Sequence, residues 1–526
     1  MAQTFTRRTV SALMASSVLA GAAPYARAQA TSRQVTLDLT KATTPVDRFF
    51  DLSVGADYPG VTIRDANLAQ LKTAAHELGF RYLRFHDIFH DDLGTVKLVD
   101  KKVVYDWTKI DYLYDTMLKY GIKPFIELGF TPSAMKTSDQ TLFYWKGNTS
   151  HPRPDMWKAL INEFVRHLIS RYGIEEVRTW YFEVWNEPNL DGFWQYADQE
   201  AYFALYGLTA RTIKAIDPAL RVGGPSTAGA AWVPELLAFA KATNTPVDFV
   251  TTHTYGVDYG YLDEEGKMDL QLSKRPDAVI GDVKKVRAEI EASHLPGLPL
   301  IFTEWSTSYN PRDLSHDSYV AAAYILSKLK SVQGTAQGMS YWVYSDLFEE
   351  PGPPSAAFHG GFGLMTREGI RKASWFTYKY LNALKGFEIP SADAQVWAAT
   401  ENGTVNAVVW DFQLPDQQGK SNGTFFSKLV PNAPAPDVTL NLTGLKPGRY
   451  ALKIHRTGYK KNDAYSAYVE LGAPKDLTPA QIKQMHALTK DAPETQKTIR
   501  IGADGKGVVS LPMHSNDVVL VSLTPQ

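Results

Sequence analysis

Two glutamates end runs of apolar and aromatic residues that are typical of buried strands. Glu187 follows the run 180–185 and precedes Pro188, and Glu304 follows the run 299–303. A carboxylate is costly to bury and proline cannot continue a strand ladder, so a strand should end here and present its glutamate. One such glutamate could simply face water. A pair flanked by tryptophans is what cleavage of a glycosidic bond requires.

Eight short apolar or β-rich runs alternate with amphipathic helical segments from about residue 48 onward. The predicted strands are 49–54, 81–85, 123–128, 179–185, 221–224, 248–252, 298–303 and 339–343. Helical segments at 68–78, 110–120, 156–172, 199–216, 233–242 and 280–292 lie between them. This alternation implies a parallel sheet and predicts an α/β fold, a (β/α)8 TIM barrel. An open doubly wound sheet is the alternative, but no Gly-rich phosphate turn follows the first strand.

The two glutamates belong to strands four and seven of this predicted barrel. Barrel active sites lie at the carboxyl ends of the strands, so both carboxylates should face one cleft. Other polar and aromatic residues also stand at predicted strand ends: His86, Glu127, His253, Tyr255 and Trp342. Their convergence predicts a single site at one end of the barrel.

The alternation of strand-like and helical segments ends after the barrel region of residues 48–384. Residues 385–526 contain short β-prone runs, and Asn402-Gly403 between two of them suits a tight hairpin turn. We expect a C-terminal β-sandwich, interrupted by one helix at 479–488. Residues 31–47 contain an alternating run that should add a strand to this sandwich.

The first 30 residues have the features of an export signal. Arg7-Arg8 precedes an apolar stretch at 12–23 that is too short to span a bilayer, and Ala26-Arg27-Ala28 offers a cleavage site. The arginine pair favours twin-arginine export, with the ordinary secretory route as the alternative. The mature protein is therefore expected in the periplasm or outside the cell, without membrane insertion.

Composition narrows the possible functions. The 526 residues include 55 basic and 56 acidic side chains, for a net charge of -1, so nucleic acid is a poor partner. The chain has no cysteine, which excludes disulfides, thiolate nucleophiles and cysteine-based zinc sites. Its 12 tryptophans and 27 tyrosines suit a sugar-binding cleft, although core packing also uses such residues.

Several segments together resemble glycoside hydrolase family 39, which contains retaining β-xylosidases and α-L-iduronidases on 4/7 (β/α)8 barrels. These segments are Arg84-Phe85-His86-Asp87 with the following Ile88–Asp92, Trp185-Asn186-Glu187-Pro188, Thr303-Glu304-Trp305, residues 341–350 and residues 358–363. The resemblance covers most of the mature chain. The His-rich segment and Phe348-Glu349-Glu350 are similar to the β-xylosidase branch.

The resemblance implies roles for individual residues. Glu187 is the expected acid/base, Glu304 the expected nucleophile, and Asn186 should hold the sugar 2-hydroxyl. Glu304 must be ionised at rest, which a neighbour such as Arg84 or Tyr255 would favour.

Six residues are expected to bind a neutral sugar without a cofactor or metal. They are His86, His253, Tyr255, Trp342, Glu349 and Glu350. The implied function is an exo-acting β-D-xylosidase on xylo-oligosaccharides, as a monomer or a homo-oligomer. An α-L-arabinosidase, an α-L-iduronidase and a non-catalytic carbohydrate-binding barrel are the alternatives.

Two further motifs have weaker chemical interpretations. His86-x-x-x-His90 has the spacing of a helical zinc pair, but His86 ends a predicted strand. Gly224-Pro225-Ser226-Thr227-Ala228 nearly matches an esterase elbow but lacks its final glycine. We interpret the second as a strand-to-loop turn.

Overall fold

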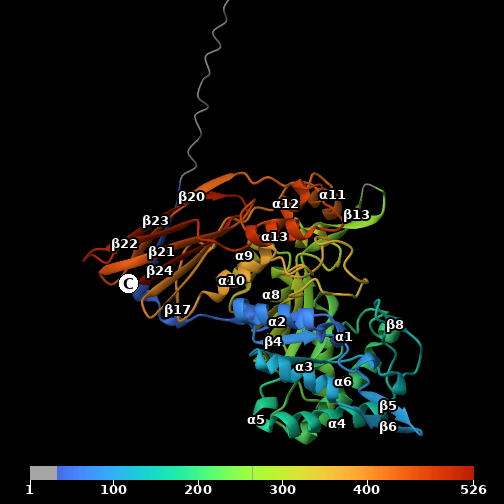
Figure 1. Cartoon of the computed structure of the whole chain (residues 1–526). Helices are drawn as coiled ribbons and strands as arrows, with labels where there is room; N and C mark the ends of the chain where they lie inside the picture. The colour runs from blue at the N-terminus through green and yellow to red at the C-terminus, as the bar shows by residue number, and fades with distance from the viewer. Residues whose placement is uncertain (1–31, 264) are drawn as a thin grey trace, which may run out of the picture.

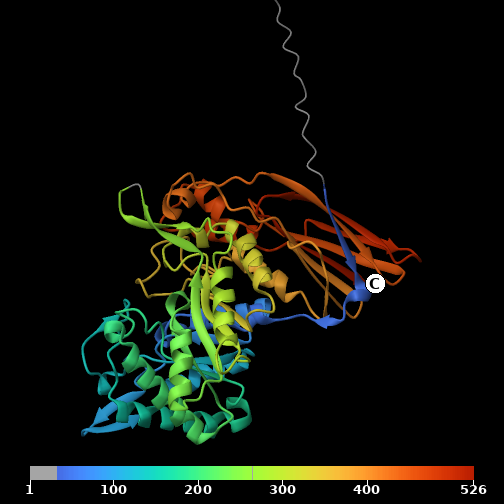
Figure 2. The same ribbon diagram turned by 180° about the vertical axis from the view of Figure 1, so that it is seen from behind.

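The computed structural model describes residues 32–263 and 265–526. The predicted export signal of residues 1–30 lies outside this part of the chain. A barrel surrounded by helices packs beside a β-sandwich formed mainly by the C-terminal residues (Figures 1 and 2). Within the described residues, no helix is both long and apolar enough to cross a membrane.

Eight parallel strands close the barrel, which confirms the predicted fold class. In order around it they are β3 (Ser53–Ala56), β4 (Tyr82–Phe85), β7 (Lys123–Leu128), β10 (Tyr181–Val184), β11 (Arg221–Thr227), β12 (Phe249–Tyr255), β15 (Leu300–Ser306) and β16 (Gly338–Tyr341). The register pairs Glu183 with Glu127 and His253 with Glu304. Neighbouring strands thus bring polar residues to the same level.

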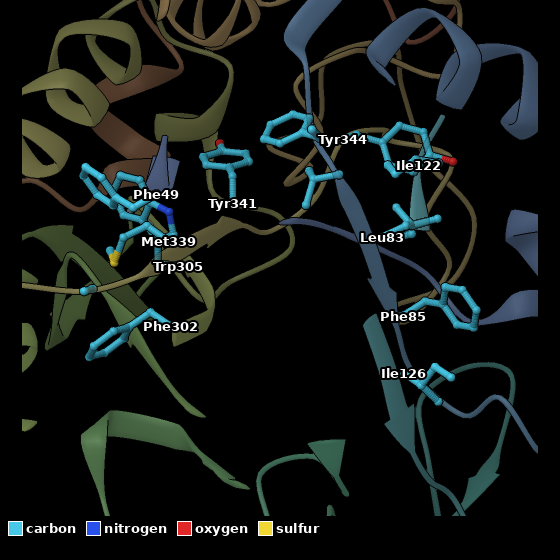
Figure 3. Close-up of a cluster of buried hydrophobic side chains, with 14 of the residues drawn as sticks. Phe49, Leu83, Phe85, Ile122, Ile126, Phe302, Trp305, Met339, Tyr341 and Tyr344 are labelled. Atoms are coloured by element: carbon cyan, nitrogen blue, oxygen red, sulfur yellow. The ribbon is translucent and has the colours of Figure 1, made fainter. Parts of the chain in front are cut away.

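Helices cover the outside of the barrel. They are α2 (Asp65–Leu78), α3 (Thr108–Lys119), α4 (Pro154–Tyr172), α6 (Gln199–Ile216), α7 (Val233–Thr243), α8 (Ile280–Glu291), α9 (Val320–Val332) and α10 (Ala373–Asn382). Apolar residues of the helices belong to the same buried cluster as strand residues such as Phe302, Met339 and Tyr341. These three strand residues are shown in Figure 3. This burial fixes the strands on which the site depends.

The amino end of the barrel interior is filled by apolar side chains. Leu52, Phe125, Phe249 and Ile301 form one buried cluster there, with Tyr82 and Tyr181 packed against it. Because this plug closes the interior from below, the polar residues that follow along each strand are left at the carboxyl end.

The sandwich has one sheet of seven strands and one of three. The larger sheet has the order β2 (Thr44–Pro45), β17 (Phe387–Ile389), β18 (Val396–Glu401), β19 (Thr404–Trp410), β24 (Val518–Pro525), β21 (Gly448–Thr457) and β22 (Thr495–Ile501). The smaller has the order β1 (Arg33–Asp38), β20 (Pro434–Thr443) and β23 (Gly507–His514). Asn402 and Gly403 join β18 to β19 with φ angles of 51° and 82°, as a type I′ turn requires.

Insertions at the carboxyl end of the barrel complete the molecule. Helices α11 (Asn422–Phe426), α12 (Ala464–Glu470) and α13 (Pro479–Leu488) come from the C-terminal part of the chain. The hairpin of β13 (Val257–Leu262) and β14 (Met268–Leu272) projects beside α11 (Figures 1 and 2). The C-terminal part therefore reaches the face that carries the site.

Several predicted boundaries differ from the structure. The first predicted strand begins as a 3-10 turn at Phe49–Asp51, and β3 starts only at Ser53. Strands β12 and β15 run three residues further than predicted, so His253 and Glu304 lie inside strands. The short strand β17 and helix α12 were not predicted, since their apolar patterns are brief. Strand β23 was also not predicted, although its residues alternate between buried and exposed positions.

Candidate active site

A cavity of about 840 Å³ lies at the carboxyl end of the barrel. The predicted site residues that line it are His86, Asn186, Glu187, Tyr255, Glu304, Trp342 and Glu350. Its volume falls within the range of pockets for drug-sized ligands and exceeds what one pentose needs. The two glutamates found from the sequence thus share one cavity.

Glu187 is turned into this cavity by an unusual backbone. Trp185 and Glu187 have φ angles of 71° and 45°, which non-glycine residues seldom adopt outside strained or functional segments. The backbone N–H of Glu187 donates to the carbonyl of Ser226 at 2.8 Å. The indole of Trp185 is buried and donates to the carbonyl of Phe193 at 2.7 Å. These bonds hold the turn after β10 in place.

Glu187 forms a close pair with a buried histidine. Oε1 of Glu187 lies 2.9 Å from Nδ1 of His253. Burial raises the pKa of Glu187 to about 7, and burial lowers the pKa of His253 to about 4. A neutral imidazole therefore faces a carboxyl group that is protonated over much of the neutral range.

Glu304 has a different environment, rich in donors to a charged carboxylate. Nη1 of Arg84 donates to Oε1 of Glu304 at 2.8 Å, and the Tyr255 hydroxyl donates to Oε2 at 2.7 Å. Both oxygens of Glu304 therefore accept a hydrogen bond from a fixed donor. The two glutamates thus differ in their partners, since Glu187 pairs with the His253 ring and Glu304 with Arg84 and Tyr255.

Arg84 connects the strand-end residues of the site, since it bonds both Glu304 and Asn186. Its guanidinium is fully buried and also donates to Glu183 at 2.5 Å, Asn186 at 2.7 Å and Ser226 at 3.1 Å. Burial alone would lower the pKa of Arg84, but the surrounding carboxylates raise it overall. Because Arg84 occupies Oδ1 of Asn186, the amide NH2 of Asn186 is oriented to donate to a ligand.

The carboxyl groups of Glu187 and Glu304 are close together. One oxygen of each and a ring nitrogen of His253 all lie within 4.8 Å of one another. Three such atoms could also approach a metal ion. Here both oxygens of Glu304 already accept hydrogen bonds from Arg84 and Tyr255, which fits a carboxylate held for attack on a substrate better than a ligand set.

A second group of residues lines the deeper part of the cavity. Nδ1 of His86 lies 2.8 Å from Glu127 Oε2, and Nε2 of His86 lies 3.1 Å from Glu350 Oε1. Burial opposes the charge on His86, but the Glu127 carboxylate outweighs it and holds the pKa of His86 well above its usual value. Burial raises the pKa of Glu350 to about 8. The buried ring of Trp342 lies 4.8 Å from that of His86.

Two predicted sugar-binding residues, Glu349 and His253, do not line the cavity. Glu349 pairs with Arg64 at 2.5 Å, so its side chain turns away from its neighbour Glu350. His253 is fully buried behind Glu187 and contacts that carboxylate instead of the open space. Adjacent loop residues face opposite ways here, and β12 extends far enough to bury His253.

Other residues of the site were not found from the sequence. Glu183 in β10 is buried between Arg84 and the Thr303 hydroxyl, and its acidic type within a strand was the only available signal. Phe143, Phe193, Tyr259, Tyr309 and Phe362 add aromatic surface to the cavity. They lie mainly in long connections between strands and helices, where no periodicity marks them.

The two weaker motifs have structural roles. Nε2 of His90 lies 2.9 Å from the Trp145 carbonyl, and Nδ1 accepts the N–H of Asp92 at 3.1 Å. Both ring nitrogens are therefore occupied by the backbone. Ser226 is fully buried beneath the cavity and accepts a hydrogen bond from Arg84, which does not suit a nucleophile.

Comparisons with known proteins agree over nearly the whole chain. The family model described as "Glycosyl hydrolases family 39" matches residues 33–506. A β-xylosidase of Geobacillus stearothermophilus is 36% identical over 480 residues, which cover 89% of this chain and 91% of that protein. The crystal structure of a GH39 enzyme from Xanthomonas axonopodis pv. citri has a TM-score of 0.94 at 61% identity, covering 96% of this chain and 100% of that one. A monomeric β-xylosidase from Caulobacter crescentus has a TM-score of 0.93 at 64% identity, covering 94% and 100%.

Proposed function

The chain belongs to glycoside hydrolase family 39 and is thus a glycosidase, and we propose that it is a retaining, exo-acting β-D-xylosidase on xylo-oligosaccharides. One observation carries the retaining mechanism. Carboxyl oxygens of Glu187 and Glu304 lie within 4.8 Å of each other. Retaining enzymes hold the two carboxyl groups about 5–5.5 Å apart, whereas inverting enzymes need about 6.5–9.5 Å to admit a water molecule.

In the proposed first step, Glu304 attacks the anomeric carbon of the terminal xylose. The bond to the leaving oxygen breaks as Glu187 gives that oxygen its proton, and a glycosyl ester of Glu304 forms. The raised pKa of Glu187 supports its role as the acid, because the carboxyl group starts protonated near neutral pH. Asn186 would donate to the 2-hydroxyl as positive charge develops on the sugar.

In the second step, water attacks the same carbon and the ester bond to Glu304 breaks. Glu187, now ionised, takes a proton from the water and returns to its acidic form. The charge of Glu304 is absent while the ester lasts, which makes ionisation of Glu187 easier at that stage. Each carboxyl group is thereby restored to its starting state.

A neutral pentose suits the lining of the cavity. Its acidic side chains are Glu187, Glu304, Glu350 and Asp282, with His86 beside them, and no lysine or arginine among the described residues lines it. An anionic uronate would meet several carboxyl groups there, which disfavours an α-L-iduronidase. An α-L-arabinosidase stays as the second candidate, because an arabinoside is also a neutral pentoside.

The deciding experiment follows the anomeric configuration of the first sugar released from an aryl β-D-xyloside, by proton NMR. Release of β-xylose supports the proposal, whereas initial α-xylose would mean inversion and overturn it. A parallel assay with an aryl α-L-arabinoside separates the two pentosides. Activity should survive dialysis against EDTA, since no step uses a metal ion.

Variants of the two glutamates separate their roles. Glu304→Ala should abolish turnover of every substrate. Glu187→Ala should slow xylobiose far more than an activated aryl xyloside, whose leaving group needs little protonation. Equal losses on both substrates would contradict the assignment of Glu187 as the acid.

We also propose that the protein is exported to the periplasm as a monomer. The N-terminal Arg7-Arg8, apolar stretch and Ala26-Arg27-Ala28 support export. Similarity to the monomeric Caulobacter enzyme supports the oligomeric state. Cell fractionation of the wild type and of the double variant Arg7→Lys, Arg8→Lys tests the route, and light scattering of the mature protein tests the mass.

A further inference from the structure

The cavity opens outward onto an exposed group of apolar side chains. We call this group the outer shelf: Tyr259 and Met268 from the β13–β14 hairpin, and Tyr309 and Pro311 from the loop after β15. Tyr259, Tyr309 and Pro311 line the main cavity and also a shallower hollow of about 320 Å³ beside it. The hollow therefore adjoins the main cavity.

Exposure of such large side chains calls for an explanation. Tyr259 is 80% exposed, Met268 71% and Tyr309 49%. Contiguous apolar surface of this kind on a soluble protein commonly marks a binding site. The shelf starts next to the reacting groups, since the ring of Tyr309 meets that of Tyr255 edge-on at 6.2 Å, and Tyr255 bonds Glu304.

The two halves of the shelf are held together from outside the barrel. Asn422, at the start of α11, is fully buried. Its Oδ1 accepts the N–H of Leu272 in β14 at 3.0 Å, and its Nδ2 donates to Asp313 at 2.7 Å. Asp313 ends the turn that begins at Asn310, next to Tyr309. One buried amide therefore connects the hairpin to the tyrosine loop.

We propose that the outer shelf binds the leaving part of the substrate, the xylose units on the reducing-end side of the cleaved bond. Asn422 is proposed as a positioning residue for it. This inference rests on the proposed xylosidase function. If the shelf binds these units, kcat/KM should be higher for longer xylo-oligosaccharides than for short glycosides.

The chemistry of the shelf fits this occupant. The terminal sugar occupies the buried end, where His86, Trp342 and Glu350 offer hydrogen bonds and a ring face. The rest of a linear xylan fragment has to leave through the open side. Xylose rings expose apolar C–H faces, which pack on tyrosine rings, and the neutral chain meets no cationic group on the shelf.

The first test compares xylobiose with xylotetraose for Tyr259→Ala and Tyr309→Ala. The ratio of kcat/KM for xylotetraose to that for xylobiose should fall about fivefold to tenfold in each variant, mainly through KM, as expected for loss of one aromatic contact. Tyr112→Ala is the matched control, because Tyr112 is 50% exposed on α3 and far along the chain from the shelf. An unchanged ratio in both shelf variants would overturn the proposal.

A second test examines the positioning role of Asn422. Asn422→Ala should lower the same ratio. Asn406→Ala should not, although it removes the hydrogen bond that the Asn406 side chain in β19 donates to the Ala383 carbonyl at the end of α10. A residue needed only for stability would reduce activity on both substrates alike and leave the ratio unchanged. That outcome would remove Asn422 from the proposal.

Binding measured without turnover separates the shelf from the proposed function. In the Glu304→Ala background, titration calorimetry should give a lower Kd for xylotetraose than for xylose, and Tyr309→Ala should remove most of the difference. Retention of β-xylose release with no such difference would contradict the shelf alone. Absence of xyloside hydrolysis in the wild type would instead contradict the proposed function.

Discussion

Nδ1 of His253 lies 2.9 Å from Oε1 of Glu187, and both side chains are buried. With a pKa of about 4, His253 carries no charge at neutral pH and cannot promote ionisation of its partner as a cationic neighbour would. Arg84, the nearby permanent cation, donates a hydrogen bond to Glu304 and none to Glu187. Of these two carboxyl groups, Glu304 is thus bonded by a cation, whereas a neutral ring lies beside Glu187.

This arrangement predicts how activity depends on pH. Burial raises the pKa of Glu187 to about 7, and the acid role needs the protonated form. The value of kcat/KM for xylobiose should thus fall as pH rises above about 7, approaching tenfold per pH unit. A pH–rate profile between pH 5 and 9 measures this decline in kcat/KM. The expected slope is that of about one ionising group. A flat profile through pH 9 would contradict the acid role of Glu187.

The Glu187→Gln variant provides the control for that profile. Its amide cannot ionise, so an activated aryl xyloside should lose the basic limb near pH 7 while still forming the glycosyl ester. If the limb persists in this variant, another group causes it.

Arg84→Met should damage both stability and activity. The change leaves Glu183, Glu127 and Glu304 without their shared buried cation, and loss of one partner of a buried ion pair costs about 3–5 kcal/mol. Urea denaturation should show this loss in the free energy of unfolding. Arg166→Met is the matched control, because Arg166 lies on the exposed face of α4, where it donates to Asn162, and should change stability by less than about 1 kcal/mol.

Tyr255→Phe removes one donor to Glu304 and little else. A hydrogen bond to a charged group contributes about 1.5–3 kcal/mol, so kcat/KM should fall about tenfold to a hundredfold. Tyr465→Phe loses a bond to the Phe426 carbonyl and serves as the comparison variant, with no expected change in kcat/KM. Equal activity of Tyr255→Phe and the wild type would show that Arg84 alone suffices.

The barrel and its two glutamates could be predicted because their signals are local. Each strand is a short apolar run, and Glu187 and Glu304 follow such runs directly. Strand ends were less accurate at β12 and β15, where polar side chains continue the strand by bonding to one another across it. The alternation of apolar and polar residues along the chain does not show which polar side chains will bond across neighbouring strands.

The rest of the site depends on contacts between distant segments. Nothing in the sequence around Glu183 indicates that it bonds Arg84, a residue of another strand. Tyr309 lines the cavity from a loop that has no regular sequence pattern. Glu349 and Glu350 are adjacent residues of the same type, but Glu349 pairs with Arg64 and Glu350 lines the cavity. Residue type and spacing therefore predicted that Glu187 and Glu304 share one cavity, but not the direction in which loop side chains point.

The contact between barrel and sandwich gives the last prediction, at Asp491. Burial alone would raise the pKa of Asp491, but hydrogen bonds from His455, Lys379 and Tyr380 outweigh it and lower the pKa to about 2. A lowered carboxyl pKa contributes stability above the unfolded value of about 4, and this contribution is lost as pH falls toward 2. Asp491→Asn should thus lower the free energy of unfolding by about 2 kcal/mol at pH 7, and the difference from the wild type should shrink between pH 4 and pH 2. Urea denaturation at several pH values measures it, with Asp504→Asn in an exposed turn as the control. A difference independent of pH would mean that the shape of Asp491, and not its charge, joins the two parts of the molecule.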